Sequence, residues 1–270
     1  MTQPVANPEF EALLDHLKHK QGCDLTGYKR STLMRRFQHR MRNIRIDNYQ
    51  SYLKYLQYHP EEPNFLLNDI LINFTGFFRD GNAWAYLAAE IVPQIIASKK
   101  ADEPIRIWSA GCASGQEVYT LLMLLAEELG VEFCLQRIQC YATDVDAEAL
   151  QQAQKASYNA FEIINLPSNL LEKYFEKDGE AYIFHQELHR LITFNQHDLM
   201  KDPPLQAVDL LICRNVLMYF TLEAQEFILS HFYAALSNLG FLFLGRAELL
   251  VHHRQFFTLS SLQQRIYTKT

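Results

Sequence analysis

Residues 105–117 constrain the fold of this chain more strongly than any other segment. They begin with a short apolar strand at 105–108, continue into a turn that contains Gly111 and Gly115, and lead into an apolar-rich helix at 117–129. A strand joined to a helix through a glycine turn is the first unit of many ligand-binding α/β folds, because glycine lets a ligand approach the backbone. We therefore expect an α/β domain whose ligand binds at the end of this strand.

The chain after this unit alternates between strand and helix patterns. Strands are predicted at 138–142, 191–194, 208–213, 241–245 and 264–268, and helices at 147–156 and 223–236. Such alternation is typical of a mostly parallel sheet with helical crossovers. Residues 158–190 interrupt the alternation, and the Asp178-Gly179 pair between aromatic segments predicts a hairpin there. A small β subdomain is therefore expected as an insertion at about 158–190.

The first hundred residues contain only helical patterns. Apolar side chains recur at helical spacing in 10–17, 33–44, 49–56, 65–70 and 84–95. These patterns predict an N-terminal helical domain over residues 1–80, followed by the α/β domain over residues 81–270.

Composition argues against several classes of protein. The net charge is −6, whereas a dedicated nucleic-acid-binding domain is usually strongly basic. The five cysteines form no Cys-x-x-Cys pair, so neither a disulfide framework nor a metal site is expected. No apolar run approaches the roughly 20 residues of a membrane span. Residues 1–10 lack the pattern of a signal peptide, so we expect a cytoplasmic protein without membrane insertion.

The turn at 111–115 narrows the class of ligand. Its Gly-x-x-x-Gly spacing lacks the third glycine of a dinucleotide-binding turn, and no Gly-Lys-Ser/Thr follows as in a P-loop. Asp144 follows the second predicted strand, where an acidic side chain can accept hydrogen bonds from ribose hydroxyls. Together these features favour a nucleoside cofactor without a pyrophosphate, with S-adenosylmethionine as the leading candidate. The alternative is a tight turn that only caps the helix.

Four segments resemble, in order and approximate spacing, the motifs of the CheR family of chemotaxis receptor methyltransferases. They are NFTGFFRD at 73–80, WSAGCASGQE at 108–117, ATDVD at 142–146 and CRNVLMYF at 213–220. The chain is therefore identified as a member of this family. Membership implies an α/β class I S-adenosylmethionine-dependent methyltransferase domain with a Rossmann-like, mostly parallel sheet, an N-terminal helical domain and a small inserted β subdomain.

The resemblance also implies the residues of the cofactor site. The implied contacts are Asn73, Thr75, Arg79, Glu117, Asp144, Asp198, Leu199, Arg214 and Asn215. The planar guanidinium of Arg79 suits the methionine carboxylate, Glu117 can hold the methionine ammonium, and Asn215 falls at the strand edge where such sheets bind ligands. Tyr219 is expected to orient the accepting carboxylate and is the candidate catalytic residue. The alternative for Tyr219 is a core aromatic.

Three features depart from the family pattern. Gln116 replaces the first acid of a Glu-Glu pair, and Asp198 stands where the family usually has Asn, so the adenine amino group would meet a carboxylate that only accepts. Members that grip the C-terminal pentapeptide of a receptor carry a longer Gly-rich loop in the inserted subdomain. The short turn at 177–180 argues against such tethering.

The implied activity is methyl transfer from S-adenosylmethionine to glutamate side-chain carboxylates of chemoreceptors, which gives methyl esters in chemotaxis-type adaptation. A glutamate carboxyl has an ordinary pKa of about 4.3 and is ionised at pH 7, so the reaction needs positioning and exclusion of water rather than a base. Two alternatives stay open. One is a non-catalytic S-adenosylmethionine-binding regulatory module, which Gln116 and Asp198 would explain, and the other is a methyltransferase of a small carboxylic acid.

The segment 28–46 is strongly basic. It contains seven lysines and arginines and no acidic residue, on a predicted amphipathic helix. Because the chain is acidic overall, this segment would offer a local basic face to an acidic partner. The residues expected to dock glutamate-rich chemoreceptor helices are Arg35, Arg36, Arg40 and Arg42. The alternative is a solvated face without a partner.

Overall fold

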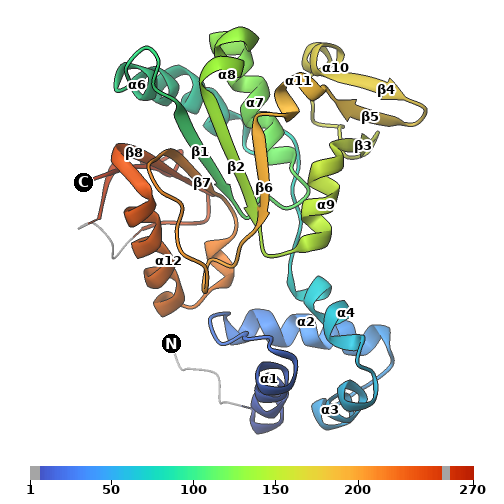
Figure 1. The fold of residues 1–270 in the computed structure, drawn as a ribbon. Helices are drawn as coiled ribbons and strands as arrows, with labels where there is room; N and C mark the ends of the chain where they lie inside the picture. The colour runs from blue at the N-terminus through green and yellow to red at the C-terminus, as the bar shows by residue number, and fades with distance from the viewer. Residues whose placement is uncertain (1–6, 251–255) are drawn as a thin grey trace. The chain divides into compact units, whose positions relative to one another are not determined.

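The structure is a computed structural model that describes residues 7–250 and 256–270. The chain forms two compact units: Met1–Ile72 with Tyr219–Gln225, and Asn73–Met218 with Glu226–Thr270. Figure 1 shows the helices and strands of both units. Among the described residues, no helix is both long enough and apolar enough to cross a membrane.

The first unit consists of short helices around an aromatic and aliphatic core. Its helices are α1 (Pro8–Gln21), α2 (Arg30–Asn43), α3 (Tyr49–Tyr58) and α4 (Glu62–Ile70). Helix α1 begins where the Asn7 side chain accepts the backbone N–H of Glu9, and it ends at Gly22, whose φ of 67° is left-handed. Phe10 and Phe37 meet edge to face in the core, with ring centroids 5.0 Å apart. The predicted N-terminal helices are confirmed.

One arginine of the predicted basic face belongs to the interior of this unit. Arg40 on α2 forms a bidentate ion pair with Glu62, at 2.8 Å from Nε to Oε1 and 2.7 Å from Nη2 to Oε2. The Tyr52 hydroxyl donates to the same carboxylate at 2.8 Å, and the Glu62 side chain is only 2% exposed. The buried Glu62 carboxylate requires the charge of Arg40, so this guanidinium already has a partner within the unit. Its docking to a receptor stays a prediction. The other arginines of that face are exposed or half-buried: Arg35, Arg36 and Arg42.

A short segment from late in the sequence completes the first unit. Tyr219–Gln225 pairs with the loop before α2, where Lys29 N donates to the backbone oxygen of Tyr219 at 2.9 Å. Phe220 forms an antiparallel β-bridge with Tyr28, and their ring centroids lie 4.6 Å apart. This pairing with the loop before α2 was not predicted from the sequence, where the segment was expected in the α/β domain.

The second unit is built on a seven-stranded sheet (Figure 1). Its strands are β1 (Ile105–Ala110), β2 (Ile138–Asp144), β6 (Ile192–Gln196), β7 (Val208–Cys213), β8 (Leu236–Leu244), β9 (Phe257–Ser261) and β10 (Ile266–Lys269). The strand order is β6-β2-β1-β7-β8-β10-β9. The first five strands in this order, from β6 through β2, β1 and β7 to β8, run parallel, whereas β10 pairs antiparallel with both of its neighbours. The predicted α/β fold with a mostly parallel sheet is confirmed.

Helices pack on both faces of this sheet. They are α5 (Gly81–Tyr86), the π-helical turn η1 (Leu87–Ile91), α6 (Val92–Ala97), α7 (Gln116–Leu129), α8 (Val131–Arg137), α9 (Ala147–Lys155) and α12 (Leu222–Ala235). Consecutive residues of a strand point to opposite faces. Ile107 of β1 lies in a core cluster with Val118 and Leu121 of α7, whereas the Trp108 ring packs against Phe232 of α12 at 5.6 Å. The sheet is therefore covered on both sides, and its strand ends are left to carry polar groups.

A small three-stranded sheet is inserted between α9 and β6. Its elements are β3 (Ser157–Asn159), α10 (Ser168–Tyr174), β4 (Phe175–Asp178), β5 (Ala181–Phe184) and α11 (Gln186–His189), with strand order β3-β5-β4. Gly179, with a φ of 58°, lies in the turn between β4 and β5, as the Asp178-Gly179 pair predicts. The Tyr158 hydroxyl on β3 donates to the backbone oxygen of Ser114 at 2.8 Å, so the inserted subdomain supports the glycine turn.

Candidate cofactor site

The glycine turn after β1 is shaped by its neighbours. Gly111 has a φ of 78°, and a Cβ atom there would lie 2.5 Å from Cγ2 of Val216. Gly115 has a φ of 92°, and a Cβ atom there would lie 2.9 Å from the Tyr119 ring. Any other residue would therefore be strained and would clash at both positions. The backbone N–H of Gly111 donates to the carbonyl of Thr143 at 2.7 Å, which ties the turn to the end of β2.

Asp144 closes this turn from the end of β2. Its Oδ2 accepts the backbone N–H of Ala113 at 2.8 Å, and its Oδ1 accepts the N–H of Asp146 at 3.0 Å. Burial raises the pKa of Asp144, and these backbone hydrogen bonds oppose the rise. The carboxylate is thus held at the carboxyl edge of the sheet, where its remaining lone pairs can accept further hydrogen bonds.

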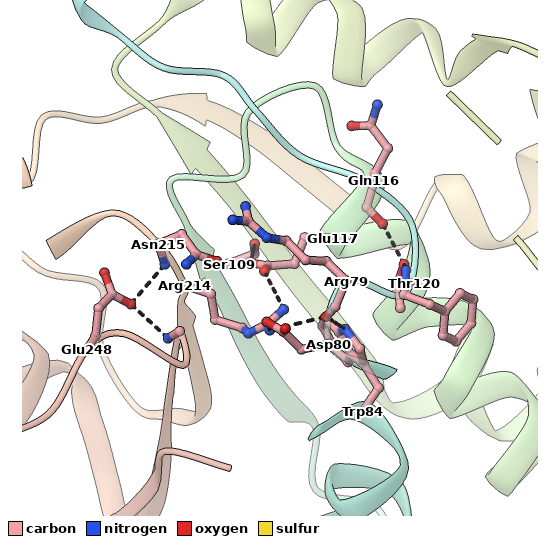
Figure 2. Close-up of polar contacts among 12 residues, drawn as sticks. Arg79, Asp80, Trp84, Ser109, Gln116, Glu117, Thr120, Arg214, Asn215 and Glu248 are labelled. Carbon is pink, nitrogen blue, oxygen red and sulfur yellow. Dashed lines mark hydrogen bonds and ion pairs between the residues drawn. The ribbon is translucent and has the colours of Figure 1, made fainter. Parts of the chain in front are cut away.

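Glu117 lies in the first turn of α7, directly after the glycine turn (Figure 2). Its Oε1 accepts from the Ser109 hydroxyl and its Oε2 from Nη1 of Arg214, each at 3.4 Å. Burial raises the pKa of Glu117, while the charge of Arg214 and the Ser109 hydroxyl lower it. Hydrogen bonds of this length are weak, so the Glu117 carboxylate keeps acceptor capacity for a closer cationic partner.

Arg214, directly after β7, joins two segments of the site. Its side chain is 2% exposed, and its Nη2 donates to Oδ2 of Asp80 at 2.7 Å and to the backbone oxygen of Arg79 at 3.2 Å. The guanidinium also lies 4.8 Å from the ring centroid of Phe243 and 5.3 Å from that of Trp84. These contacts link Arg214 to the segment that carries Arg79 and Asp80. Its expected contact with a cofactor stays a prediction.

Arg79 contrasts with Arg214. Its Nη1 donates to the backbone oxygen of Phe74 at 3.1 Å, and its guanidinium lies 5.3 Å from the exposed Phe74 ring. Within residues 7–250 and 256–270, no carboxylate forms an ion pair with Arg79. Figure 2 shows its guanidinium pointing away from Asp80. Arg79 therefore has donors left for an anionic ligand.

Asn215 and Glu248 form a clamp after β7 (Figure 2). Asn215 has a left-handed φ of 61°, and its backbone N–H donates to Oε2 of Glu248 at 2.8 Å. The same oxygen accepts the N–H of Gly245 at 2.7 Å, and Oε1 accepts the N–H of Met218 at 3.2 Å. Burial raises the pKa of Glu248, and these hydrogen bonds lower it. The sequence analysis missed Glu248, although a lone acid between Ala247 and Leu249 after a buried strand is a usable signal.

Other expected cofactor contacts lie in the segment after α4 and in the segment after β6. The side-chain amide of Asn73 donates to Oδ2 of Asp146 at 2.6 Å, and Asp146 caps α9. Asp198 follows β6, where its Oδ1 accepts the N–H of Met200 at 2.9 Å and its Oδ2 lies 3.1 Å from Nζ of Lys201. Two further expected contacts are half-buried: Thr75 and Leu199.

Tyr219 is the one expected site residue that falls in the first unit. Its backbone oxygen accepts from Lys29, as described above, and its side chain is half-buried. The role of its hydroxyl in catalysis stays a prediction. Gln116, which departs from the family pattern, is buried, and its Oε1 accepts from the Ser114 hydroxyl at 2.8 Å.

The polar groups after β1 and at the end of β2, together with Arg79 in the segment before α5, fit S-adenosylmethionine chemically. Arg79 offers unpaired donors for a carboxylate, Glu117 offers an acceptor for an ammonium, and Asp144 offers acceptors for hydroxyls. The two glycines of the turn leave the backbone open to close approach. An amino acid joined to a nucleoside presents these partners together, which a simple helix cap would not require.

Comparisons with known proteins agree with this fit. The family profile described as "CheR methyltransferase, SAM binding domain" matches residues 73–266, and "CheR methyltransferase, all-alpha domain" matches residues 8–71. The chemotaxis protein methyltransferase of Escherichia coli K12 is 30% identical over 273 residues, which cover 96% of this chain and 91% of that protein. The corresponding protein of Listeria innocua is 28% identical over 94% of each chain.

A longer relative is similar to this chain over only part of its own length. A 104.1 kDa protein of Rhodobacter capsulatus, named by its position in the hypE 3' region, is 35% identical over 240 residues. The match covers 89% of this chain but spans only 25% of that protein. With both family profiles matched over nearly its whole length, this chain belongs to the CheR family of S-adenosylmethionine-dependent methyltransferases.

Proposed function

We propose that this protein transfers the methyl group of S-adenosylmethionine to glutamate side-chain carboxylates of chemoreceptors. The observation that carries the proposal is the site itself: the unpaired guanidinium of Arg79 and the loosely bonded carboxylate of Glu117 accompany an intact CheR family match. The chemotaxis methyltransferases of Escherichia coli and Listeria innocua support the substrate class through their names.

In this proposal each polar residue holds one part of the cofactor. Arg79 binds the methionine carboxylate, Glu117 binds the ammonium, and Asp144 accepts from the ribose hydroxyls. The segment that follows β6 receives the adenine. The remaining residues of the proposed site surround these groups: Asn73, Thr75, Asp198, Leu199, Arg214 and Asn215.

The chemistry requires alignment more than proton transfer. When bound, S-adenosylmethionine supplies an electrophilic methyl group on a positively charged sulfur. A glutamate carboxylate is already ionised at pH 7, so the protein has to orient it and exclude water. We assign the orienting role to the hydroxyl of Tyr219.

The departures from the family pattern are compatible with catalysis. Gln116 replaces an acid of the family pattern. Its Oε1 is hydrogen-bonded to Ser114 inside the turn, so the missing charge lies away from the groups proposed to hold the cofactor. Asp198 is partly neutralised by Lys201 at 3.1 Å, and its carboxylate can still accept from the adenine amino group.

The partner in this proposal is the glutamate-rich helical region of a chemoreceptor. Arg35, Arg36 and Arg42 offer positive charge on α2, whereas Arg40 is engaged by Glu62. Docking through such a face accelerates encounter and depends on salt. Gly179 and Glu180 alone separate β4 from β5, so we do not propose tethering to a receptor pentapeptide.

One assay separates the three candidate functions. The purified protein is incubated with methyl-labelled S-adenosylmethionine and either cytoplasmic fragments of chemoreceptors or a panel of small carboxylic acids. Base-labile label on the receptor fragments supports the proposal. Label on small acids alone would assign the protein to small-molecule methylation, and cofactor binding without any transfer would make it a regulatory module.

A further inference from the structure

Glu248 has an environment that the proposed chemistry does not explain. It is 5% exposed and accepts hydrogen bonds from the backbone N–H groups of Asn215, Gly245 and Met218. The bonds to Asn215 and Gly245 are short, at 2.8 and 2.7 Å. Burial of a carboxylate is costly unless such donors satisfy it. The Glu248 carboxylate and the three backbone N–H groups therefore hold one another in place.

The segment that Glu248 holds is the one that carries Arg214 and Asn215. Asn215 is left-handed, with a φ of 61°, which a residue other than glycine adopts only at some cost in free energy. The hydrogen bond from its backbone N–H to Glu248 compensates for that cost. The neighbouring Val216 lies against Gly111, where even a single added carbon would sit 2.5 Å from Cγ2. A shift of this segment would therefore move the wall that faces the glycine turn.

Gly245 permits this clamp by its lack of a side chain. A Cβ atom at Gly245 would lie 2.7 Å from the backbone nitrogen of Asn215 and 2.8 Å from Oε2 of Glu248. The backbone after β8 therefore lies closer to the backbone after β7 than a side chain at position 245 would allow.

We propose that Glu248 is a positioning residue of the cofactor site: its carboxylate fixes the Asn215–Met218 backbone so that Asn215 and Val216 form the wall opposite the glycine turn. The proposal rests on the proposed cofactor contact of Asn215. A carboxylate is required because all three partners are donors. An amide has only one acceptor oxygen. Its NH2 group would face at least one of these N–H donors, and that donor would lose its hydrogen bond.

The test compares four single variants and one double variant by calorimetric titration with S-adenosylmethionine, well below their unfolding temperatures. Glu248→Gln removes the charge and keeps the size, and Gly245→Ala disturbs the same clamp from the other strand. Asp209→Asn is the matched control, because Asp209 is a buried carboxylate at the opposite end of β7 that accepts the backbone N–H of Arg106 at 2.9 Å. Asn215→Gly keeps the left-handed backbone and removes only the side-chain amide.

We expect Glu248→Gln and Gly245→Ala each to weaken cofactor binding about tenfold, the factor that one hydrogen bond to a charged group supplies. Asp209→Asn should lower the unfolding temperature and leave the dissociation constant unchanged. The double variant of Glu248 and Gly245 should bind no more weakly than either single variant, because both break one clamp.

Two results would overturn the proposal. One is wild-type affinity in folded Glu248→Gln, and the other is an equal loss of affinity in Asp209→Asn, which would make the effect one of stability alone. Asn215→Gly distinguishes the two assignments: wild-type affinity there removes the Asn215 contact from the proposed function, whatever Glu248 does.

Discussion

Nη2 of Arg214 lies 2.7 Å from Oδ2 of Asp80 and 3.2 Å from the backbone oxygen of Arg79. One buried guanidinium therefore anchors the backbone of the segment that carries a second, unpaired guanidinium. The indole N–H of Trp84 donates to the same oxygen of Arg79 at 3.0 Å. The side chain of Arg79 is thus presented from a fixed backbone, which reduces the entropy that an ordered contact with a ligand would lose.

Removing the Arg79 side chain should weaken cofactor binding without destabilising the protein. Arg79→Ala is expected to raise the dissociation constant of S-adenosylmethionine about ten- to a hundredfold, since a hydrogen bond to a charged group contributes about 1.5–3 kcal/mol. Arg79→Lys should recover only part of this, because an ammonium cannot make two parallel bonds to a carboxylate. Calorimetry measures the affinity and urea denaturation the stability. Wild-type affinity in Arg79→Ala would refute the assignment.

The affinity for S-adenosylmethionine should fall in acid because of Glu117. Burial raises the pKa of Glu117, and only its ionised form can hold an ammonium. Binding should therefore weaken as the pH drops through this raised pKa. The stability of the protein without cofactor should change with pH in the opposite direction. Because the folded state holds the proton of Glu117 more tightly than the unfolded chain does, the free energy of unfolding that Glu117 contributes is lost as pH rises through the folded pKa.

A matched variant checks this dependence on pH. Glu117→Gln should bind weakly at every pH and lose the acid-side change that is due to this carboxyl. Titrations in buffers of different ionisation enthalpy should also show proton release on binding to the wild type near the raised pKa. A wild-type affinity that does not change with pH would contradict the role of Glu117.

The two kinds of arginine on α2 should behave differently. Charge reversal of Arg35 and Arg42 together is expected to raise the KM for receptor and to leave the unfolding temperature nearly unchanged, because both side chains are exposed. The rate on receptor should also fall with salt. Arg40→Ala should instead lower the free energy of unfolding by about 3 kcal/mol, because it leaves the Glu62 carboxylate buried without its partner. A double reversal that leaves KM and salt dependence unchanged would identify a solvated face.

Tyr219→Phe should slow methyl transfer and leave the affinity for S-adenosylmethionine unchanged. The substitution removes a hydroxyl and keeps the ring, so the pairing of this segment with the loop before α2 should persist. Single-turnover rates with saturating receptor fragment measure the effect. Equal rates in Tyr219→Phe and the wild type would remove this hydroxyl from the mechanism.

Local patterns predicted the elements that build the site. The strand at 105–108, the glycine turn and the following helix appear as β1, Gly111 to Gly115 and α7. Apolar runs encode the strand and the helix, and the turn needs glycine because neighbouring atoms leave no room for a Cβ atom. Short windows of sequence are therefore enough to predict these elements. The boundary of the domains at residue 80 stays a prediction, whereas the compact units divide after Ile72.

The features that the sequence analysis missed depend on contacts between distant segments. Glu248 lies 33 residues from Asn215, and Arg40 lies 22 residues from Glu62, so neither pairing has a local signature. The predicted strand at 241–245 begins earlier, at Leu236 in β8, and β9 and α8 were not assigned. In β8 the polar and glycine residues at 237–240 weaken the apolar pattern, while pairing with β7 still holds the backbone extended.

In the proposed function, the site around Arg79 and Glu117 transfers a methyl group to a receptor carboxylate. Its most direct test is peptide mass spectrometry of a chemoreceptor cytoplasmic fragment after incubation with S-adenosylmethionine and either the wild-type protein or Arg79→Ala. With the wild type we expect methyl esters on glutamate side chains that disappear after mild base, and at a limiting concentration of cofactor Arg79→Ala should form them about ten- to a hundredfold more slowly. Tight cofactor binding by the wild type with no ester on any receptor fragment, or esters formed equally by Arg79→Ala, would contradict it.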